Sequence, residues 1–126
     1  MHERLGGFDE SMPALEDVDY CLRARAEGIE LELVSDALLH YRYRTGWGAT
    51  FRQARTYAEQ MARVQRAYEE KDARPRGRPW LLRGWKPILS TLPSLHRRGS
   101  RAKLAWLLGW QVGRYVGSVR YRVLAY

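Results

Sequence analysis

Two long stretches with helical spacing of apolar residues constrain the fold most. In residues 49–72 one stripe is formed by Phe51, Ala54, Tyr57, Ala58, Met61, Val64 and Tyr68. Residues 100–126 repeat the pattern with Leu104, Leu107, Leu108, Val112, Tyr115, Val119 and Val123. This period is typical of amphipathic α-helices. Between the two stretches, residues 73–87 contain three prolines, two glycines and five cations, which favours a linker or a surface segment.

Charge is divided unevenly along the chain. The formal net charge is +8, from 22 Lys and Arg against 14 Asp and Glu. Residues 75–126 contain 11 of these cations and no acid, whereas residues 1–74 carry a net charge of −3. A purely basic block favours a polyanionic partner, either an anionic membrane surface or a nucleic acid.

Several classes of protein are disfavoured by the sequence. The apolar stretch from Leu104 to Val119 is interrupted by Gln111 and Arg114 and is shorter than the ~20 residues that a spanning helix needs. Residues 1–10 lack the apolar core of a secretory signal. The single cysteine, Cys21, cannot form an internal disulfide, which favours a reducing compartment. We therefore expect a cytoplasmic protein, peripheral at the inner face of the cell membrane.

A glycine-containing loop and a predicted helix make up residues 6–28, GGFDESMPALEDVDYCLRARAEG. The predicted helix covers residues 15–27, and we expect it to end at Gly28. Five carboxylates fall within eleven positions: Asp9, Glu10, Glu16, Asp17 and Asp19. Residues 29–34 then alternate apolar and acidic side chains, which predicts a strand, and residues 37–44 predict a second one.

The acidic cluster has a structural and a functional interpretation. The helix macrodipole stabilises acids in a first turn by ~0.3–1 kcal/mol each, which accounts for the acids of the predicted helix without any function. Asp17 and Asp19 alone cannot chelate one ion, because residues i and i+2 of a helix point to different sides. Asp9 and Glu10 are either loop-capping acids or ligand contacts.

The order of these segments resembles a known family. Residues 5 to about 44 resemble the C-terminal half of the catalytic domain of family 2 glycosyltransferases. The resemblance lies in the order of four segments: GGFDE, then EDVDYCLRARAEG, a predicted strand and DALLHYRYR. The resemblance implies an α/β fold: a partial GT-A (Rossmann-like) domain over residues 1–44 followed by basic amphipathic helices. These helices would occupy residues 45–74 and 100–126, the second on a membrane surface, with a Pro/Arg-rich linker at residues 75–99.

The same resemblance implies an inverting, nucleotide-sugar-dependent transfer to a glycan, cell-envelope or lipid-linked acceptor. Glu16 and Asp17 resemble the catalytic acidic pair, with Asp17 as the general base. Such a base takes the proton of the attacking hydroxyl and contributes ~10²–10⁴-fold. Substrate contacts would come from Gly6, Gly7, Phe8, Asp9 and Asp19. His40 would help to hold Mg²⁺ or Mn²⁺, a divalent metal expected only in a complete enzyme; without the resemblance, His40 is interpreted as a core or strand-edge histidine.

The nucleotide-binding half of such enzymes has no counterpart before Gly6. We therefore expect a C-terminal fragment that is inactive in isolation, and sugar transfer by the purified chain would contradict this. We also expect pairing with a separate N-terminal half, or self-association through uncovered apolar surface, which sedimentation at increasing concentration would test.

The alternative function is a non-catalytic basic binding module. Residues 75–126 add Trp80, Trp85, Trp106 and Trp110 to their cations, which suits an anionic bilayer at ~1 kcal/mol for each cation near its surface. The same composition could bind nucleic acid through phosphates and stacking, but the acidic N-terminal half and the lack of a nucleic-acid motif disfavour that partner.

Three glycines of the last predicted helix recur at every fourth position: Gly109, Gly113 and Gly117. They would line one helix face and permit close contact with another helix or with lipid. The alternative is simple tolerance of glycine at a cost of ~1 kcal/mol each relative to alanine.

Overall fold

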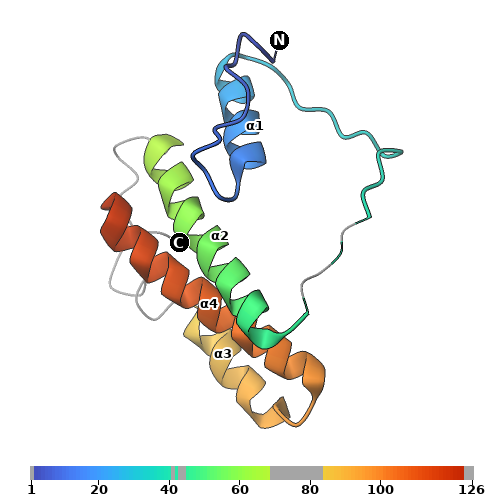
Figure 1. Cartoon of the computed structure of the whole chain (residues 1–126), viewed down its shortest axis with the longest axis vertical. Coiled ribbons are helices and arrows are strands. Elements are labelled where there is room, and N and C mark those ends of the chain that lie inside the picture. The colour runs from blue at the N-terminus through green and yellow to red at the C-terminus, as the bar shows by residue number, and fades with distance from the viewer. Residues whose placement is uncertain (1, 41, 43–44, 69–83, 124–126) are drawn as a thin grey trace. The chain divides into compact units, whose positions relative to one another are not determined.

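The computed structural model describes residues 2–40, 42, 45–68 and 84–123 (Figure 1). The chain divides into an N-terminal unit, Met1–Arg44, and a C-terminal unit, Thr45–Tyr126. The N-terminal unit contains one helix, α1 (Glu16–Ala26), within its described residues. The described part of the C-terminal unit contains α2 (Trp47–Tyr68), α3 (Trp85–Thr91), the short 3-10 helix η2 (Leu92–Ser94) and α4 (Arg98–Tyr121).

Helix α1 forms where the apolar spacing predicts it and ends at the predicted glycine. Gly28 has φ 76°, a left-handed conformation that glycine adopts without strain. The N–H of Ile29 donates to the carbonyl of Ala24 at 3.0 Å, and the N–H of Gly28 donates to that of Arg25 at 3.0 Å. These two bonds form a Schellman cap, which satisfies carbonyls that the helix leaves open. The prediction that Gly28 ends this helix is confirmed.

The predicted α/β fold is wrong. No residue that the structure describes lies in a strand, so the partial GT-A (Rossmann-like) domain is corrected to a helical unit. Residues 29–40 contain an extended segment and a turn, with Leu33 92% exposed. Alternation favours a strand only where a neighbouring strand binds its backbone and its apolar face is covered, and the described residues provide neither. Residues 41, 43 and 44 of the second predicted strand lie outside the described residues.

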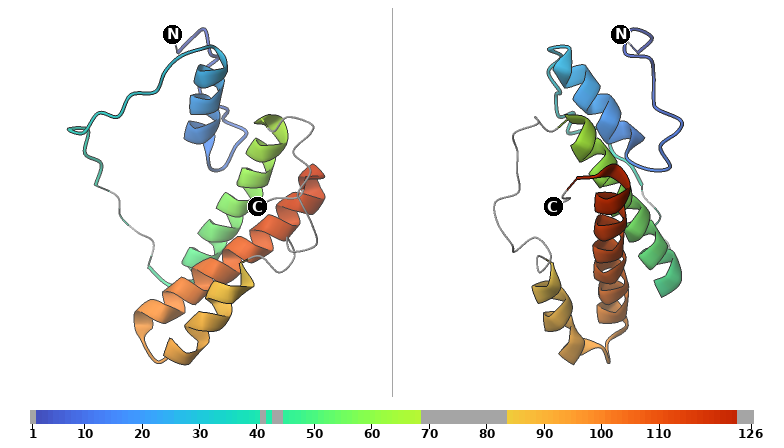
Figure 2. Two further views of the ribbon diagram at one scale, coloured as in Figure 1. Left: turned by 180° about the vertical axis from the view of Figure 1, so that it is seen from behind. Right: turned by 90° about the vertical axis from the view of Figure 1, so that its left-hand side faces the viewer.

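The C-terminal unit is built on close packing between α2 and α4, which lie side by side in Figures 1 and 2. The contact is made by small residues on both helices: Ala54, Ala58 and Ala62 on α2, and Gly109, Gly113 and Gly117 on α4. A Cβ atom added at Gly117 would lie 2.7 Å from the Cβ of Ala62. No such atom fits, so glycine is what lets the two backbones approach. The prediction that these glycines permit close contact with another helix is confirmed.

Polar residues accompany this contact. Glu59 of α2 and Arg120 of α4 form an ion pair at 2.7 Å, and the Glu59 carboxylate raises the pKa of the Arg120 guanidinium above its usual value. Arg114, only 2% exposed, lies in the buried part of α4. Ser118 Oγ donates to the Arg114 carbonyl at 2.7 Å. Within the basic residues 75–126, Arg114 is therefore buried and unavailable to a partner, whereas the paired Arg120 stays exposed.

Residues 85–94 are helical, although they lie in the segment predicted as a linker. Helix α3 packs on α4 and buries Ile88 and Thr91, while Trp85 Nε1 donates to the Tyr115 hydroxyl at 3.0 Å. Pro87 is compatible with this helix because it occupies the first turn, where a missing N–H breaks no intrahelical bond. Residues 75–83 of the predicted linker lie outside the described residues.

Candidate functional site

The predicted substrate loop of the N-terminal unit is held on α1 by one arginine. Gly6 and Gly7 have φ 75° and 71°, so this tight turn requires residues without a Cβ. The Arg23 guanidinium donates to the carbonyls of Leu5 and Gly7, the latter at 2.7 Å. Its Nε donates to the Asp19 carboxylate at 2.9 Å. Asp19, predicted as a substrate contact, therefore orients the arginine that fastens the loop.

The remaining loop residues also make local contacts. Asp9 Oδ1 accepts hydrogen bonds from the backbone N–H of Ser11 at 2.9 Å and from its hydroxyl at 2.6 Å. Of the two interpretations of Asp9, this geometry supports loop capping. The half-exposed Phe8 ring lies 4.9 Å from the Tyr20 ring, between centroids, and so covers part of α1.

The predicted catalytic pair lies on the exposed start of α1. Asp17 Oδ1 accepts a hydrogen bond from the N–H of Val18 at 2.8 Å, and Glu16 is exposed. Asp17 also borders a pocket of about 230 Å³ whose other walls include Cys21, Leu22 and Leu31. Both acids occupy the first helical turn, where the macrodipole stabilises them. Their catalytic roles remain predictions.

The predicted metal ligand His40 is exposed in the extended segment after α1. Among the residues that the structure describes, no group of three or more His, Cys, Asp or Glu side chains is placed to hold a metal ion. Mg²⁺ and Mn²⁺ require several oxygen ligands at one point. The described residues therefore do not assemble a metal site around His40, and metal binding remains a prediction.

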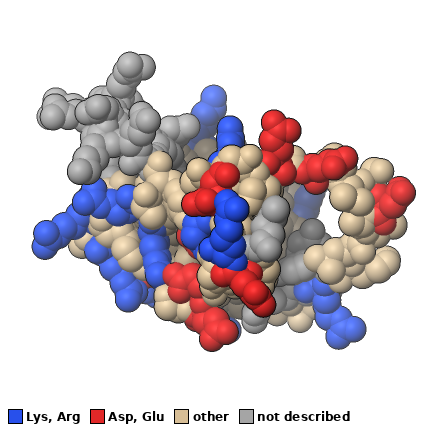
Figure 3. Space-filling view, turned by 90° about the horizontal axis from the view of Figure 1, so that it is seen from above, with Lys and Arg blue, Asp and Glu red and all other residues tan. Residues whose placement is uncertain are grey.

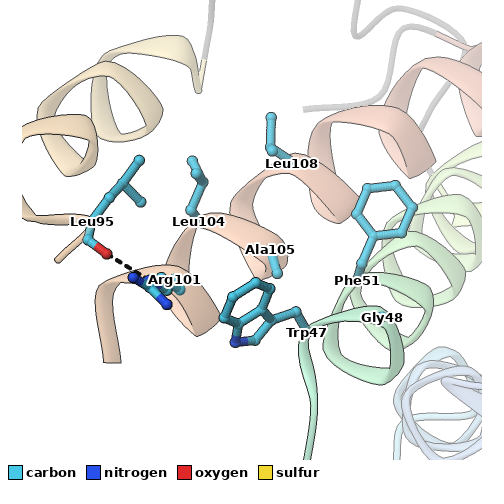
Figure 4. Close-up of a pocket in the computed structure, with 8 residues that line it drawn as sticks. All are labelled: Trp47, Gly48, Phe51, Leu95, Arg101, Leu104, Ala105 and Leu108. Carbon is cyan, nitrogen blue, oxygen red and sulfur yellow. Dashed lines mark hydrogen bonds between the residues drawn. The ribbon is translucent and has the colours of Figure 1, made fainter. Parts of the chain in front are cut away.

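A larger pocket, of about 530 Å³, lies within the C-terminal unit (Figure 4). Its apolar walls are formed by Trp47 and Phe51 of α2, by Leu104, Ala105 and Leu108 of α4, and by Leu95 between η2 and α4. This volume is within the ~300–1,000 Å³ typical of small-molecule pockets. The sequence did not predict this pocket, because Trp47 and Phe51 lie some 50 positions before the other lining residues and meet them only where α2 packs against α4.

One charged side chain, Arg101, lines this pocket. Its guanidinium carbon lies 5.4 Å from the centroid of the Trp47 ring, a cation–π contact. Its Nε donates to the Leu95 carbonyl at 2.7 Å, the dashed line of Figure 4. Two contacts thus hold a cation beside an apolar cavity.

Apolar and basic side chains are also exposed together along α3 and η2. We call Trp85, Lys86, Leu89 and Leu92 the α3 face; all four are exposed, Leu89 by 60% and Leu92 by 45%. Arg97 and Lys103, exposed as well, follow in the chain. No acidic residue occurs in residues 75–126, so the α3 face has no carboxylate in its own segment.

The two units differ in charge. The N-terminal unit contains 5 Lys and Arg and 10 Asp and Glu, whereas the C-terminal unit contains 17 and 4. Side chains of both signs reach the surface drawn in Figure 3. The cations that could meet a polyanion therefore belong mainly to the C-terminal unit. None of the described helices has the length and apolarity required to cross a bilayer.

Comparison with known protein families, with curated proteins and with solved structures found no match. The resemblance to family 2 glycosyltransferases is therefore corrected: no solved GT-A structure matches the chain, and its described residues contain no strand from which a GT-A sheet could be built. The order of segments that suggested this family is also met by the structure of residues 2–40, in which a loop is followed by α1 and by a segment without helix or strand.

Proposed function

We propose that this chain is a helical module that docks on anionic membrane surfaces through its C-terminal unit. The α3 face carries the proposal, because Leu89 and Leu92 are exposed beside Lys86 in a segment without acids. An exposed leucine is unfavourable in water and favourable at the boundary between lipid headgroups and acyl chains. The function is binding at the membrane surface, and the general-base role of Asp17 is not part of it.

The expected energies favour such binding. Burying a leucine side chain fully contributes about 1.5–3 kcal/mol, and the partly exposed Leu89 can contribute about half of that. Each cation near an anionic surface adds about 1 kcal/mol, which falls off within a Debye length. The apolar and ionic contributions are therefore similar in size, and the binding should depend on both lipid charge and salt.

A nucleic acid suits the same surface less well. Binding of single strands uses exposed aromatic faces on which bases stack. On the α3 face only Trp85 is aromatic, 38% exposed, beside the more exposed Leu89 and Leu92. Trp106 and Trp110 are only partly exposed and stack on each other with their ring centroids 6.3 Å apart. Aliphatic side chains such as Leu89 gain nothing from phosphates. The described surface therefore favours lipid.

Vesicle flotation of the full chain tests the proposal. We expect binding to vesicles that contain phosphatidylglycerol, little binding to pure phosphatidylcholine, and weaker binding at high salt. Leu89→Ser should weaken binding about fivefold to tenfold, since about 1 kcal/mol of burial is lost. Val119→Ser is the matched control, because Val119 is also exposed and apolar but lies near the end of α4.

Two outcomes would contradict membrane docking. One is equal binding to neutral and anionic vesicles with no effect of Leu89→Ser. The other is salt-sensitive binding to a single-stranded oligonucleotide without binding to either kind of vesicle, which would transfer the function to nucleic acid.

A further inference from the structure

We propose that the pocket between α2 and α4 takes up one acyl chain of an anionic lipid, whose phosphate binds Arg101. The inference rests on the proposed membrane docking and adds a subsite for a single lipid molecule. It differs from surface docking in predicting saturable binding with one ligand per chain.

The lining of the pocket suits an acyl chain. Trp47 and Phe51 on α2 and Leu104 and Leu108 on α4 line the pocket with apolar side chains (Figure 4). The pocket is open to solvent, so its apolar walls are exposed to water, and covering them with an apolar ligand is favourable. A flexible hydrocarbon chain fills such a space without leaving a polar group unsatisfied.

The position of Arg101 suits an anionic headgroup. Its Nε is occupied by the Leu95 carbonyl, and no described residue accepts a hydrogen bond from its two terminal nitrogens. Stacking on Trp47 and the bond to Leu95 restrict the guanidinium before any ligand arrives. A restrained guanidinium can donate two parallel hydrogen bonds to a phosphate, with less entropy lost on binding.

Charge and position select a membrane lipid among possible amphiphiles. The walls contain no carboxylate, and Arg101 is the charged side chain that lines them, so an anionic headgroup is favoured over a cationic one. Leu95 lines the pocket and directly follows η2, which carries Leu92 of the α3 face. The pocket therefore continues the surface that meets the bilayer, from which a lipid chain can enter it.

Calorimetric titration of the full chain with dodecyl phosphate, kept below micelle formation, tests the subsite. We expect one saturable site. Butyl phosphate, which has the charge without the long chain, and dodecyl phosphocholine, which adds a cation to the headgroup, should each bind at least about tenfold more weakly.

Two substitutions and one control variant locate the site. Arg101→Gln should weaken binding of dodecyl phosphate about tenfold or more, because a charged hydrogen-bond donor is lost. Lys103→Gln removes an exposed cation of the same helix that does not line the pocket, and should change binding by less than about twofold. Ala105→Phe places a ring in the cavity and should abolish binding, with helicity checked by circular dichroism.

The result that overturns the subsite is unsaturable binding, or equal affinity of the parent, Arg101→Gln and Lys103→Gln. Vesicle flotation of the same proteins separates the two proposals. Vesicle binding without binding of dodecyl phosphate leaves docking in place and rejects the subsite. Saturable, Arg101-dependent binding of dodecyl phosphate without vesicle binding supports the subsite and rejects docking.

Discussion

Gly113 shows at the scale of one residue how the distance between α2 and α4 is set. A Cβ atom added there would overlap the backbone carbonyl of Arg55 and lie 2.9 Å from the Cβ of Ala58. Removing this overlap would require α2 and α4 to move apart along their whole contact, because Arg55 and Ala58 both belong to the face of α2 that packs on α4. At this position an alanine, normally the best helix former, is therefore unfavourable.

We expect Gly113→Ala to lower the free energy of unfolding by about 1–3 kcal/mol, the usual cost of overpacking. Gly99→Ala is the control, since Gly99 also lies in α4 but a Cβ there meets open space. That variant should be neutral or more stable by up to about 1 kcal/mol, because alanine favours the helix. Urea unfolding followed by circular dichroism measures both, and equal stabilities would show that α2 and α4 are not closely packed.

At the scale of elements, Arg23 joins a loop to a helix. It binds the Leu5 and Gly7 carbonyls and the Asp19 carboxylate, so the residues interpreted as a substrate site are linked by structural contacts. The ion pair with Asp19 is only partly exposed, with 28% of the Arg23 side chain and 14% of the Asp19 side chain accessible. Removing the arginine therefore leaves partly buried acceptors without their donor.

Arg23→Gln should accelerate amide hydrogen exchange at Gly6 and Gly7 at least about tenfold, because glutamine cannot reach all three acceptors and the turn opens more often. The matched control is Arg25→Gln, which removes an exposed cation of the same helical turn. Exchange measured by NMR should be nearly unchanged in the control. If the two variants exchange alike, the loop is held by its own glycine turn and not by Arg23.

At the scale of the whole molecule, the division into two units separates the acidic part of the chain from the basic part. The C-terminal unit carries a net charge of +13 and the N-terminal unit −5. The contacts that stabilise the helix pair, among them Glu59 with Arg120 and the glycine-alanine face, all lie within residues 45–126. The C-terminal unit therefore contains both its own core and the proposed docking surface.

A fragment of residues 45–126 should fold into a helical structure and keep salt-sensitive binding to phosphatidylglycerol vesicles. We expect its affinity to equal or exceed that of the full chain, because the fragment lacks the net negative charge of the N-terminal unit. Residues 1–44 alone should not bind. Circular dichroism and vesicle flotation of both fragments test this, and binding by residues 1–44 alone would place the docking surface elsewhere.

Local patterns predicted the helices well. The apolar spacing located α1, α2 and α4, and Gly28 marked the end of α1, because helical hydrogen bonds and caps involve residues close in sequence. The capping role of Asp9 was one of two stated alternatives for the same reason: its partner, Ser11, is two residues away. The helix α3 was missed because Pro87 and the neighbouring glycines were interpreted as breaks, although a first turn accepts proline.

Predictions that required contacts between residues far apart in the sequence were less successful. Alternation in residues 29–34 indicates a strand only when another strand lies beside it, and the described residues contain none. A sequence of short motifs in the right order likewise does not establish a family, because each motif is compatible with more than one local structure. The acids of α1 have a sufficient electrostatic explanation at the helix start.

By itself, then, the sequence determined the positions of the three long helices, the turn at Gly28, the small-residue face of α4 and the separation of charge. Each of these depends on side-chain spacing or on summed charge. The tertiary structure alone decided that the glycines meet Ala54, Ala58 and Ala62, that Arg114 is buried, and that Trp47 joins Arg101 at an apolar pocket. These contacts join residues some 50 positions apart, and only the packing of α2 against α4 brings such residues within van der Waals distance.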